Sequence, residues 1–273
     1  MYEIFVAIIL GIVEGLTEFL PVSSTGHLIL TGHLLDFTGT KANTFEVVIQ
    51  LGAILAVAII YWKRILNLFG LMKDKAGVAS ERKLNLIHVI LAMLPALGLG
   101  LIAHGFIKEY LFTPETVLIG LVVGGIFMII AEKKQPVVRT QHIDELTYSQ
   151  AFGIGLIQCL ALWPGFSRSG ATIAGGMLLG TSVRAAADFS FLVAIPMMVA
   201  ASGYDLLKTW HLFEPSDLPW FATGFIVSFI VAYIAVVGFL KLLEKVKLSS
   251  FAYYRFIVAI VFLVLMITGV INF

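Results

Sequence analysis

The sequence predicts an all-α integral membrane protein with an inverted repeat of two units, each one re-entrant helical hairpin followed by three transmembrane helices. Three observations lead to this fold class. The 273 residues are 59% hydrophobic and 13% charged, with a mean hydropathy of +0.99, which is far more apolar than a soluble domain. Matching residues recur at a constant spacing, and basic residues gather in alternate loops.

Six apolar runs are long enough to cross about 30 Å of hydrocarbon. Two further apolar segments, at 2–35 and 148–182, are each interrupted by a polar, serine-rich turn. Each of these two segments is therefore predicted to be a pair of half-helices. The predicted spans lie at roughly 44–62, 84–107, 115–132, 186–207, 219–240 and 252–271.

The two serine-rich turns belong to two copies of one unit. A shift of 144 residues pairs Gly11 with Gly155, Glu14 with Gln158, Ser24 with Arg168, Gly26 with Gly170 and Phe45 with Phe189. The first repeat is predicted at 1–135 and the second at 146–273, within a single membrane domain.

The basic residues of the loops predict the orientation. They concentrate at 63–83, 133–147 and 241–250, which places these three loops in the cytoplasm. Residues 1–43 then begin and end outside, and residues 148–185 begin and end inside, so both broken segments are re-entrant. Each repeat makes an odd number of crossings, which inverts the second copy and brings the two hairpin tips together near the middle of the membrane.

Two acidic residues precede the first tip. Glu14 and Glu18 are four residues apart on one helix, so their carboxylates share a face and can converge on a cation. Charged groups at this depth are costly and need a partner, either a divalent ion or an arginine. The alternative is that both glutamates only cap the helix or extend toward the outer surface.

The first tip carries hydroxyl groups and a histidine. Ser24 is the candidate nucleophile, and His27 lies three residues further along, close enough for a general base. Ser23 is either an N-cap or a ligand for the substrate. Ser23, Thr25 and Gly26 are predicted to bind the substrate.

The second tip combines a flexible turn, hydroxyl donors, helix-start amides and one arginine, a set that suits phosphate or pyrophosphate. The alternative is a glycine-rich capping turn in which Arg168 pairs with Glu14 or Glu18 for structure alone. The predicted phosphate ligands are Gly165, Ser167, Arg168, Ser169, Gly170 and Thr172.

Other features limit the range of functions. A net charge of +1 without a basic stripe argues against a nucleic-acid partner. The one cysteine, Cys159, cannot form an internal disulfide, and the first apolar segment does not resemble a cleaved signal. Gln50 either lines the cavity or bonds a neighbouring helix. Gly120 and Gly124 predict close helix packing within or between subunits, so a homodimer is possible.

Both polar motifs resemble the two signatures of the undecaprenyl-diphosphate phosphatase family, also called bacitracin-resistance proteins. The motifs are the stretch from Glu14 to His27 and the stretch from Pro164 to Thr172, and the resemblance extends over the full length. It implies a bacterial plasma-membrane enzyme that removes the terminal phosphate of the C55 polyprenyl diphosphate. It also implies dependence on Mg²⁺ or Ca²⁺, with the family's acidic motif carried over to Glu14 and Glu18.

For the reaction we expect Ser24 to attack the terminal phosphorus while His27 manages the proton and Arg168 holds the diphosphate. Direct attack by water stays open as a second route. We expect the site to open on the extracytoplasmic side, since the first hairpin enters from there. The rival function is a polyprenyl-phosphate flippase or transporter built on the same inverted repeat. A channel or a purely structural protein would not explain Ser24, His27 and Arg168.

Overall fold

The computed structural model describes residues 1–71, 84–111, 113–209, 211, 214–243 and 245–270, and this part of the chain is built from helices. Six of them are long and apolar enough to cross a membrane. The predicted all-α, multi-span class is therefore confirmed, with helix ends within a few residues of the expected ones. The long helices are α3 (Thr40–Ile60), α5 (Leu86–Phe106), α6 (Pro114–Lys133), α9 (Val183–Thr209), α10 (Leu218–Leu242) and α11 (Leu248–Ile267).

The two broken segments form pairs of shorter helices. The first pair is α1 (Tyr2–Thr17) and α2 (Ser24–Leu34), and the second is α7 (Tyr148–Gln158) and α8 (Arg168–Leu178). Helices α2, α7 and α8 have 11 residues each, so each is only about 16 Å long and cannot cross about 30 Å of hydrocarbon.

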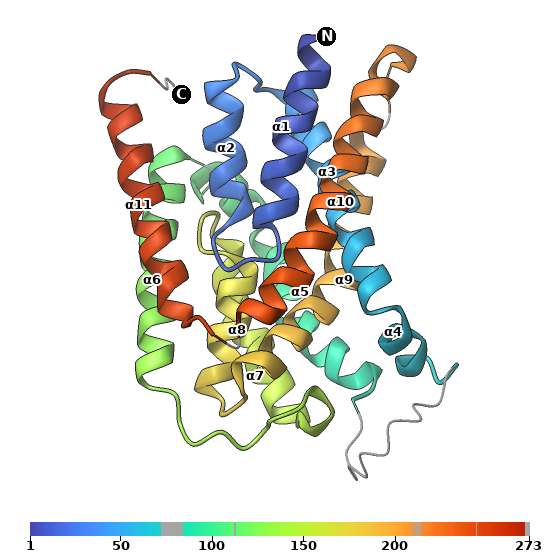
Figure 1. Ribbon diagram of the computed structural model, residues 1–273, viewed down its shortest axis with the longest axis vertical. Helices are drawn as coiled ribbons and strands as arrows, with labels where there is room; N and C mark the ends of the chain where they lie inside the picture. The colour runs from blue at the N-terminus through green and yellow to red at the C-terminus, as the bar shows by residue number, and fades with distance from the viewer. Residues whose placement is uncertain (72–83, 112, 210, 212–213, 244, 271–273) are drawn as a thin grey trace.

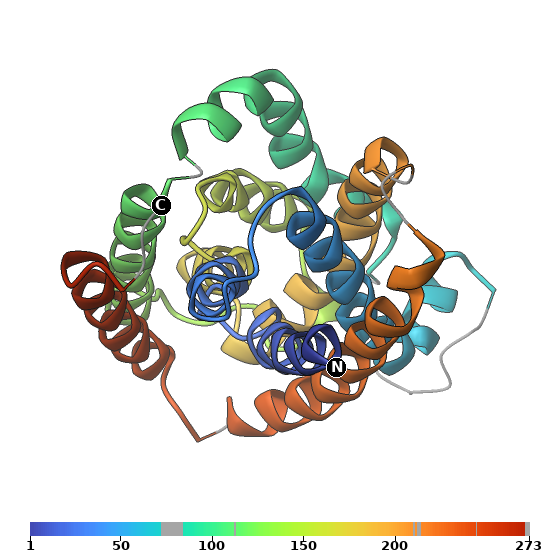
Figure 2. The same cartoon turned by 90° about the horizontal axis from the view of Figure 1, so that it is seen from above.

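The turns of the two pairs meet inside the molecule. In Figure 1 the turn between α1 and α2 reaches mid-height from the end that bears the N-terminus, and the loop before α8 reaches a similar level from the other end. Figure 2 shows α2 and α8 near the middle, surrounded by the long helices. This arrangement has the shape expected of two re-entrant hairpins, whereas their direction relative to a bilayer stays a prediction.

Glycines bring the first hairpin close to its neighbours. A Cβ at Gly15 would lie 2.7 Å from the Ser228 carbonyl oxygen on α10, and one at Gly52 would lie 2.5 Å from that of Phe225. Such contacts allow α1, α3 and α10 to pack backbone against backbone, as small residues do in membrane helices. The first hairpin is thereby held firmly in the bundle.

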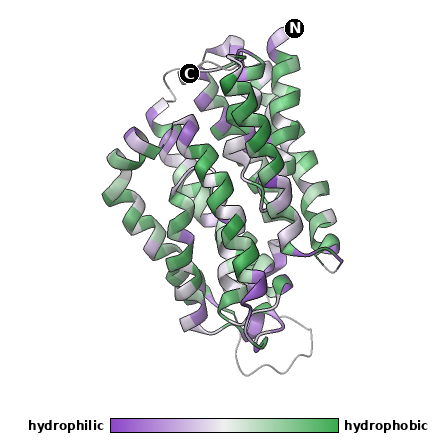
Figure 3. Ribbon diagram, turned by 90° about the vertical axis from the view of Figure 1, so that its left-hand side faces the viewer, coloured by the Kyte–Doolittle hydropathy of each residue, from purple (hydrophilic) through white to green (hydrophobic). Residues whose placement is uncertain are grey.

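The distribution of hydrophobic residues agrees with this helix arrangement. Figure 3 shows hydrophobic residues along the long helices, with hydrophilic residues gathered toward the two ends. Some of the basic residues that predict the cytoplasmic side, namely Lys73, Lys75, Arg82 and Lys83, lie outside the described residues.

Candidate active site

The two tips have the same local backbone. Ser23 and Ser167, which are related by the 144-residue shift, adopt the left-handed conformation with φ of 73° and 76°. Each is the N-cap of the following helix, and its hydroxyl accepts a hydrogen bond from the backbone N–H of Gly26 (3.4 Å) or Gly170 (3.1 Å). Non-glycine residues in this region are strained by about 1–3 kcal/mol and persist where surrounding structure holds them, often at functional sites.

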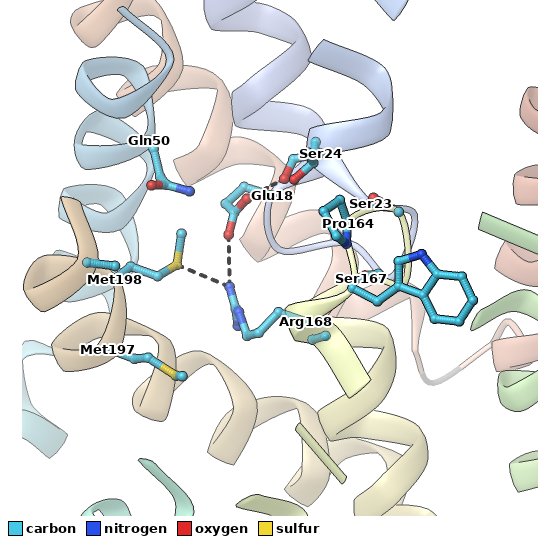
Figure 4. Close-up of a pocket in the computed structure, with 14 residues that line it drawn as sticks. Glu18, Ser23, Ser24, Gln50, Pro164, Ser167, Arg168, Met197 and Met198 are labelled. Atoms are coloured by element: carbon cyan, nitrogen blue, oxygen red, sulfur yellow. Dashed lines mark hydrogen bonds and ion pairs between the residues drawn. The ribbon is translucent and has the colours of Figure 1, made fainter. Parts of the chain in front are cut away.

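An ion pair joins the tips. The Arg168 guanidinium donates from Nη2 to Oε1 of Glu18 at 3.0 Å, and both side chains are largely buried. The Ser24 hydroxyl donates to the other Glu18 oxygen, Oε2, at 2.5 Å. Figure 4 shows Glu18 between Ser24 and Arg168. The predicted nucleophile and the predicted phosphate ligand are therefore held on one carboxylate.

A cavity of about 200 Å³ opens beside this group. It is smaller than the roughly 300 Å³ at which pockets begin to enclose drug-sized ligands, so it suits a compact polar headgroup. Six of the predicted site residues line it in addition to Glu18: Ser23, Ser24, Thr25, Gly165, Ser167 and Arg168.

The Arg168 side chain is also held by contacts other than its ion pair with Glu18. Its Nη1 donates to the backbone oxygen of Ser190 at 3.3 Å, and Nη2 also contacts the Met198 sulfur at 3.4 Å. The guanidinium carbon lies 5.5 Å from the centre of the Phe19 ring, within the range of a cation–π interaction. These contacts set the direction of the positive charge before any ligand arrives.

Other polar residues of the second tip bond to neighbouring backbone and side-chain groups. The Ser169 hydroxyl donates to the Leu20 backbone oxygen at 2.8 Å, which connects the two tips directly. The Thr172 hydroxyl donates to the Arg168 backbone oxygen at 2.9 Å and contacts the Ser190 hydroxyl at 2.6 Å. Ser169, Gly170 and Thr172, like Gly26 in the first tip, are not among the residues that line the cavity.

The turn of the second tip packs on a glycine face of α6. A Cβ at Gly120 would lie 2.3 Å from the Pro164 carbonyl oxygen, and one at Gly124 would lie 2.5 Å from that of Phe166. Of the two possibilities left open for these glycines, packing within the subunit is the one that the structure shows. Gly165 itself has φ of +89° and no room for a side chain.

His27 is not placed as expected. Its Nδ1 lies 2.8 Å from the Ser23 backbone oxygen, and its Nε2 lies 2.9 Å from the Tyr254 hydroxyl. Because a carbonyl oxygen can only accept, a neutral ring carries its proton on Nδ1, and Nε2 accepts from Tyr254. The expected hydrogen bond between His27 and Ser24 is absent from the described residues, since both ring nitrogens are used elsewhere and Ser24 turns to Glu18.

Glu14 is buried, with 1% of its surface exposed, and neither carboxylate oxygen has a hydrogen-bond partner among the described residues. Glu46 on α3 lies within electrostatic range of it. Buried carboxylates without partners are rare, and a bound cation would satisfy these oxygens. The described residues form no group of three or more His, Cys, Asp or Glu side chains that could hold a metal ion, so a cation on Glu14 and Glu18 would need ligands other than these side chains, and it stays a prediction.

Several residues of the site were missed from the sequence. Arg255 on α11 is fully buried, and it donates to backbone oxygens of Leu121 (3.1 Å), Gly120 (3.1 Å) and Gly165 (2.8 Å). An arginine inside a predicted span was a usable signal. Ser190 gave no such signal, since a serine in a long helix is common and only the fold brings it to Arg168.

Comparison with known proteins agrees with these motifs. The family model described as "Bacitracin resistance protein BacA" matches residues 7–261. The chain belongs to this family. It is 57% identical to "Undecaprenyl-diphosphatase 1" of Bacillus thuringiensis (strain Al Hakam) over 264 residues, which cover 97% of this chain and 98% of the relative. It is 58% identical to the protein of the same name from Bacillus anthracis, with the same coverage. Membership agrees with the resemblance drawn from the two tips.

Proposed function

We propose that the protein is an undecaprenyl-diphosphate phosphatase of the bacterial plasma membrane, which converts the diphosphate to undecaprenyl phosphate and inorganic phosphate. The product is the lipid carrier for peptidoglycan and other envelope polymers, and abundant enzyme confers bacitracin resistance. The observation that carries the proposal is the arrangement of Ser24 and Arg168 on one buried carboxylate, Glu18, between the two tips. The names of the relatives support a hydrolase over the rival transporter.

In the proposed reaction Arg168 binds the terminal phosphate and stabilises the charge that develops on its oxygens. The Ser24 hydroxyl attacks the terminal phosphorus and gives its proton to Glu18 Oε2, which already accepts its hydrogen bond. The bond from this phosphorus to the bridging oxygen breaks, and undecaprenyl phosphate leaves with the proton that Glu18 passes to its phosphate. Glu18, ionised again, then takes a proton from the water that attacks the phosphoserine. The bond from phosphorus to the Ser24 oxygen breaks, Glu18 returns the proton to Ser24, and inorganic phosphate leaves.

The acidic pair is proposed to hold the metal. Glu14 and Glu18 would bind a Mg²⁺ or Ca²⁺ ion, which would neutralise negative charge on phosphate oxygens. The unpartnered oxygens of Glu14 support this role. Arg168 would carry a positive charge in the site whether or not the metal ion is bound.

The experiment that tests the function is phosphate release by the purified protein from undecaprenyl diphosphate in detergent. We expect release by the wild type and loss of at least 100-fold in Arg168→Ala. Transbilayer movement of the lipid in liposomes without any hydrolysis would instead support the transporter.

We further propose that the cavity opens to the extracytoplasmic side, because the first hairpin carries Glu18 and Ser24 and is predicted to enter from there. Thr25 lines the cavity and is half-buried. A Thr25→Cys variant, with Cys159 replaced by serine, should react with an impermeant thiol reagent added outside intact cells. Reaction only in inverted vesicles would contradict this orientation.

A further inference from the structure

The cavity has two walls of different chemistry. The tips supply the polar wall with Glu18, Ser24 and Arg168, whereas Met197, Met198 and Ala201 of α9 form an apolar wall. Gln50 of α3 lies beside this apolar wall: Figure 4 shows it on the same side of Glu18 as the two methionines, opposite Ser23, Ser167 and Pro164. Gln50 is thus a polar group at the border with the apolar wall, as is Arg168, whose Nη2 contacts the Met198 sulfur.

One half of the Gln50 amide is already occupied. The Ser202 hydroxyl of α9 donates to Gln50 Oε1 at 2.9 Å, and Ser202 is 1% exposed. The other half, the Nε2 amino group, has no hydrogen-bond partner among the described residues, and Figure 4 shows it directed toward Glu18. A donor that faces a cavity is available to an acceptor that binds there. Ser202 therefore fixes the amide so that it presents two N–H groups to whatever the cavity binds.

We propose that Gln50 Nε2 donates to the phosphate that remains on the lipid, and that Ser202 is the positioning residue that orients it. This inference rests on the proposed function. In the proposed reaction Arg168 binds the terminal phosphate beside Ser24, and the isoprenoid chain would continue along apolar surface, which places the lipid-linked phosphate at the border of the two walls. Gln50 occupies that border.

The chemistry of an amide suits this position. It donates to an anion without adding a full positive charge, so it helps to bind the diphosphate and still permits the lipid monophosphate to leave. A carboxylate at the same place would repel both. Gln50 would thereby distinguish lipid-linked phosphate from inorganic phosphate, which fills the terminal position alone.

The test measures inhibition constants of two products in the purified enzyme, undecaprenyl phosphate and inorganic phosphate. Gln50→Met keeps the side-chain length and removes the donors. In this variant we expect the inhibition constant of undecaprenyl phosphate and the KM of the diphosphate to rise about ten- to a hundredfold. This is the usual effect of losing a hydrogen bond to a charged group. The inhibition constant of inorganic phosphate should stay within about twofold, which also shows that the pocket is folded. Gln50→Glu should weaken lipid phosphate binding further.

Ser202 is tested by a double-mutant cycle. Ser202→Ala should change the same constants in the same direction but less, and the double variant with Gln50→Met should be no weaker than Gln50→Met alone. Ser228→Ala is the matched control. Ser228 is also fully buried, and its hydroxyl donates to the Ile49 backbone oxygen of α3 at 2.7 Å, but it does not line the cavity. This variant should leave the ratio of the inhibition constants of undecaprenyl phosphate and inorganic phosphate unchanged.

Three results would overturn the inference: unchanged constants in Gln50→Met, equal shifts for both products, or additive effects of Gln50→Met and Ser202→Ala. A failure of the proposed function is distinguishable from these, because the wild-type enzyme itself would then release no phosphate.

Discussion

The sharpest prediction concerns which residue takes the proton from Ser24. Sequence reasoning assigned this role to His27, whereas the structure places the Ser24 hydroxyl 2.5 Å from Glu18 and uses both nitrogens of His27 elsewhere. We therefore expect Glu18→Gln to lower kcat far more than His27→Gln. Gln replaces each side chain with a neutral group of similar reach.

The expected sizes differ because the contacts differ. A general base typically contributes about 10²- to 10⁴-fold, and Glu18 accepts the Ser24 hydrogen bond while paired with the Arg168 guanidinium. Glu18→Gln also leaves the Arg168 charge without its partner, which in a buried pair costs about 3 kcal/mol or more. His27→Gln disturbs the hydrogen bonds to the Ser23 backbone oxygen and the Tyr254 hydroxyl, each worth about 1 kcal/mol. Neither bond involves Ser24, so kcat should fall by less than about tenfold.

The assay is steady-state phosphate release from undecaprenyl diphosphate, with thermal unfolding in the same detergent as a measure of folding. The two variants should separate by at least about tenfold in kcat, and Glu18→Gln should also unfold at a lower temperature. If His27→Gln is folded and as slow as Glu18→Gln, the assignment of the proton to Glu18 is wrong.

Three further outcomes are expected. Rapid quenching of the wild type with labelled substrate should trap phosphate on Ser24, and Ser24→Ala should lose at least about 100-fold in turnover; near-normal turnover would instead favour direct attack by water. Gly120→Ala should destabilise the protein by about 1–3 kcal/mol in thermal unfolding and lower its activity, since the added Cβ would lie 2.3 Å from a backbone oxygen. Gly98 has open space around it, so Gly98→Ala should change neither stability nor activity. Chelation should lower wild-type turnover with recovery on addition of Mg²⁺ or Ca²⁺, and Glu14→Gln should abolish this recovery; turnover indifferent to chelation would refute the metal.

The spans and the tips could be predicted because their signals are local. An apolar run of 20 residues forms a helix wherever it meets lipid, since every backbone group must then be satisfied within the segment. The serine-rich turns interrupt such runs, which identifies them without knowledge of the fold. The same reasoning named Ser24, Glu18 and Arg168, the three residues that the structure brings together.

Which atoms bond could not be predicted, because it depends on contacts between distant segments. The spacing of Ser24 and His27 along one helix suggested a pair, yet Tyr254, 227 residues further along the chain from His27, occupies the imidazole. Thr172 was likewise predicted to bind phosphate, and the sequence could not show that its hydroxyl lies 2.6 Å from that of Ser190; its role toward phosphate stays a prediction. A hydroxyl or an imidazole serves several partners equally well, so only the fold decides between them.

The matched positions of the two repeats explain how one duplicated unit can supply two different functions. Ser24 and Arg168 occupy corresponding positions after the left-handed N-cap serines, and Glu18 receives a hydrogen bond from each. Two identical tips could not do this, since two serines would lack a fixed charge and two arginines would repel each other and lack a nucleophile. Divergence at this pair, together with Glu18, whose counterpart at the same shift is Leu162, gives the proposed site an attacking group on one side and a phosphate ligand on the other.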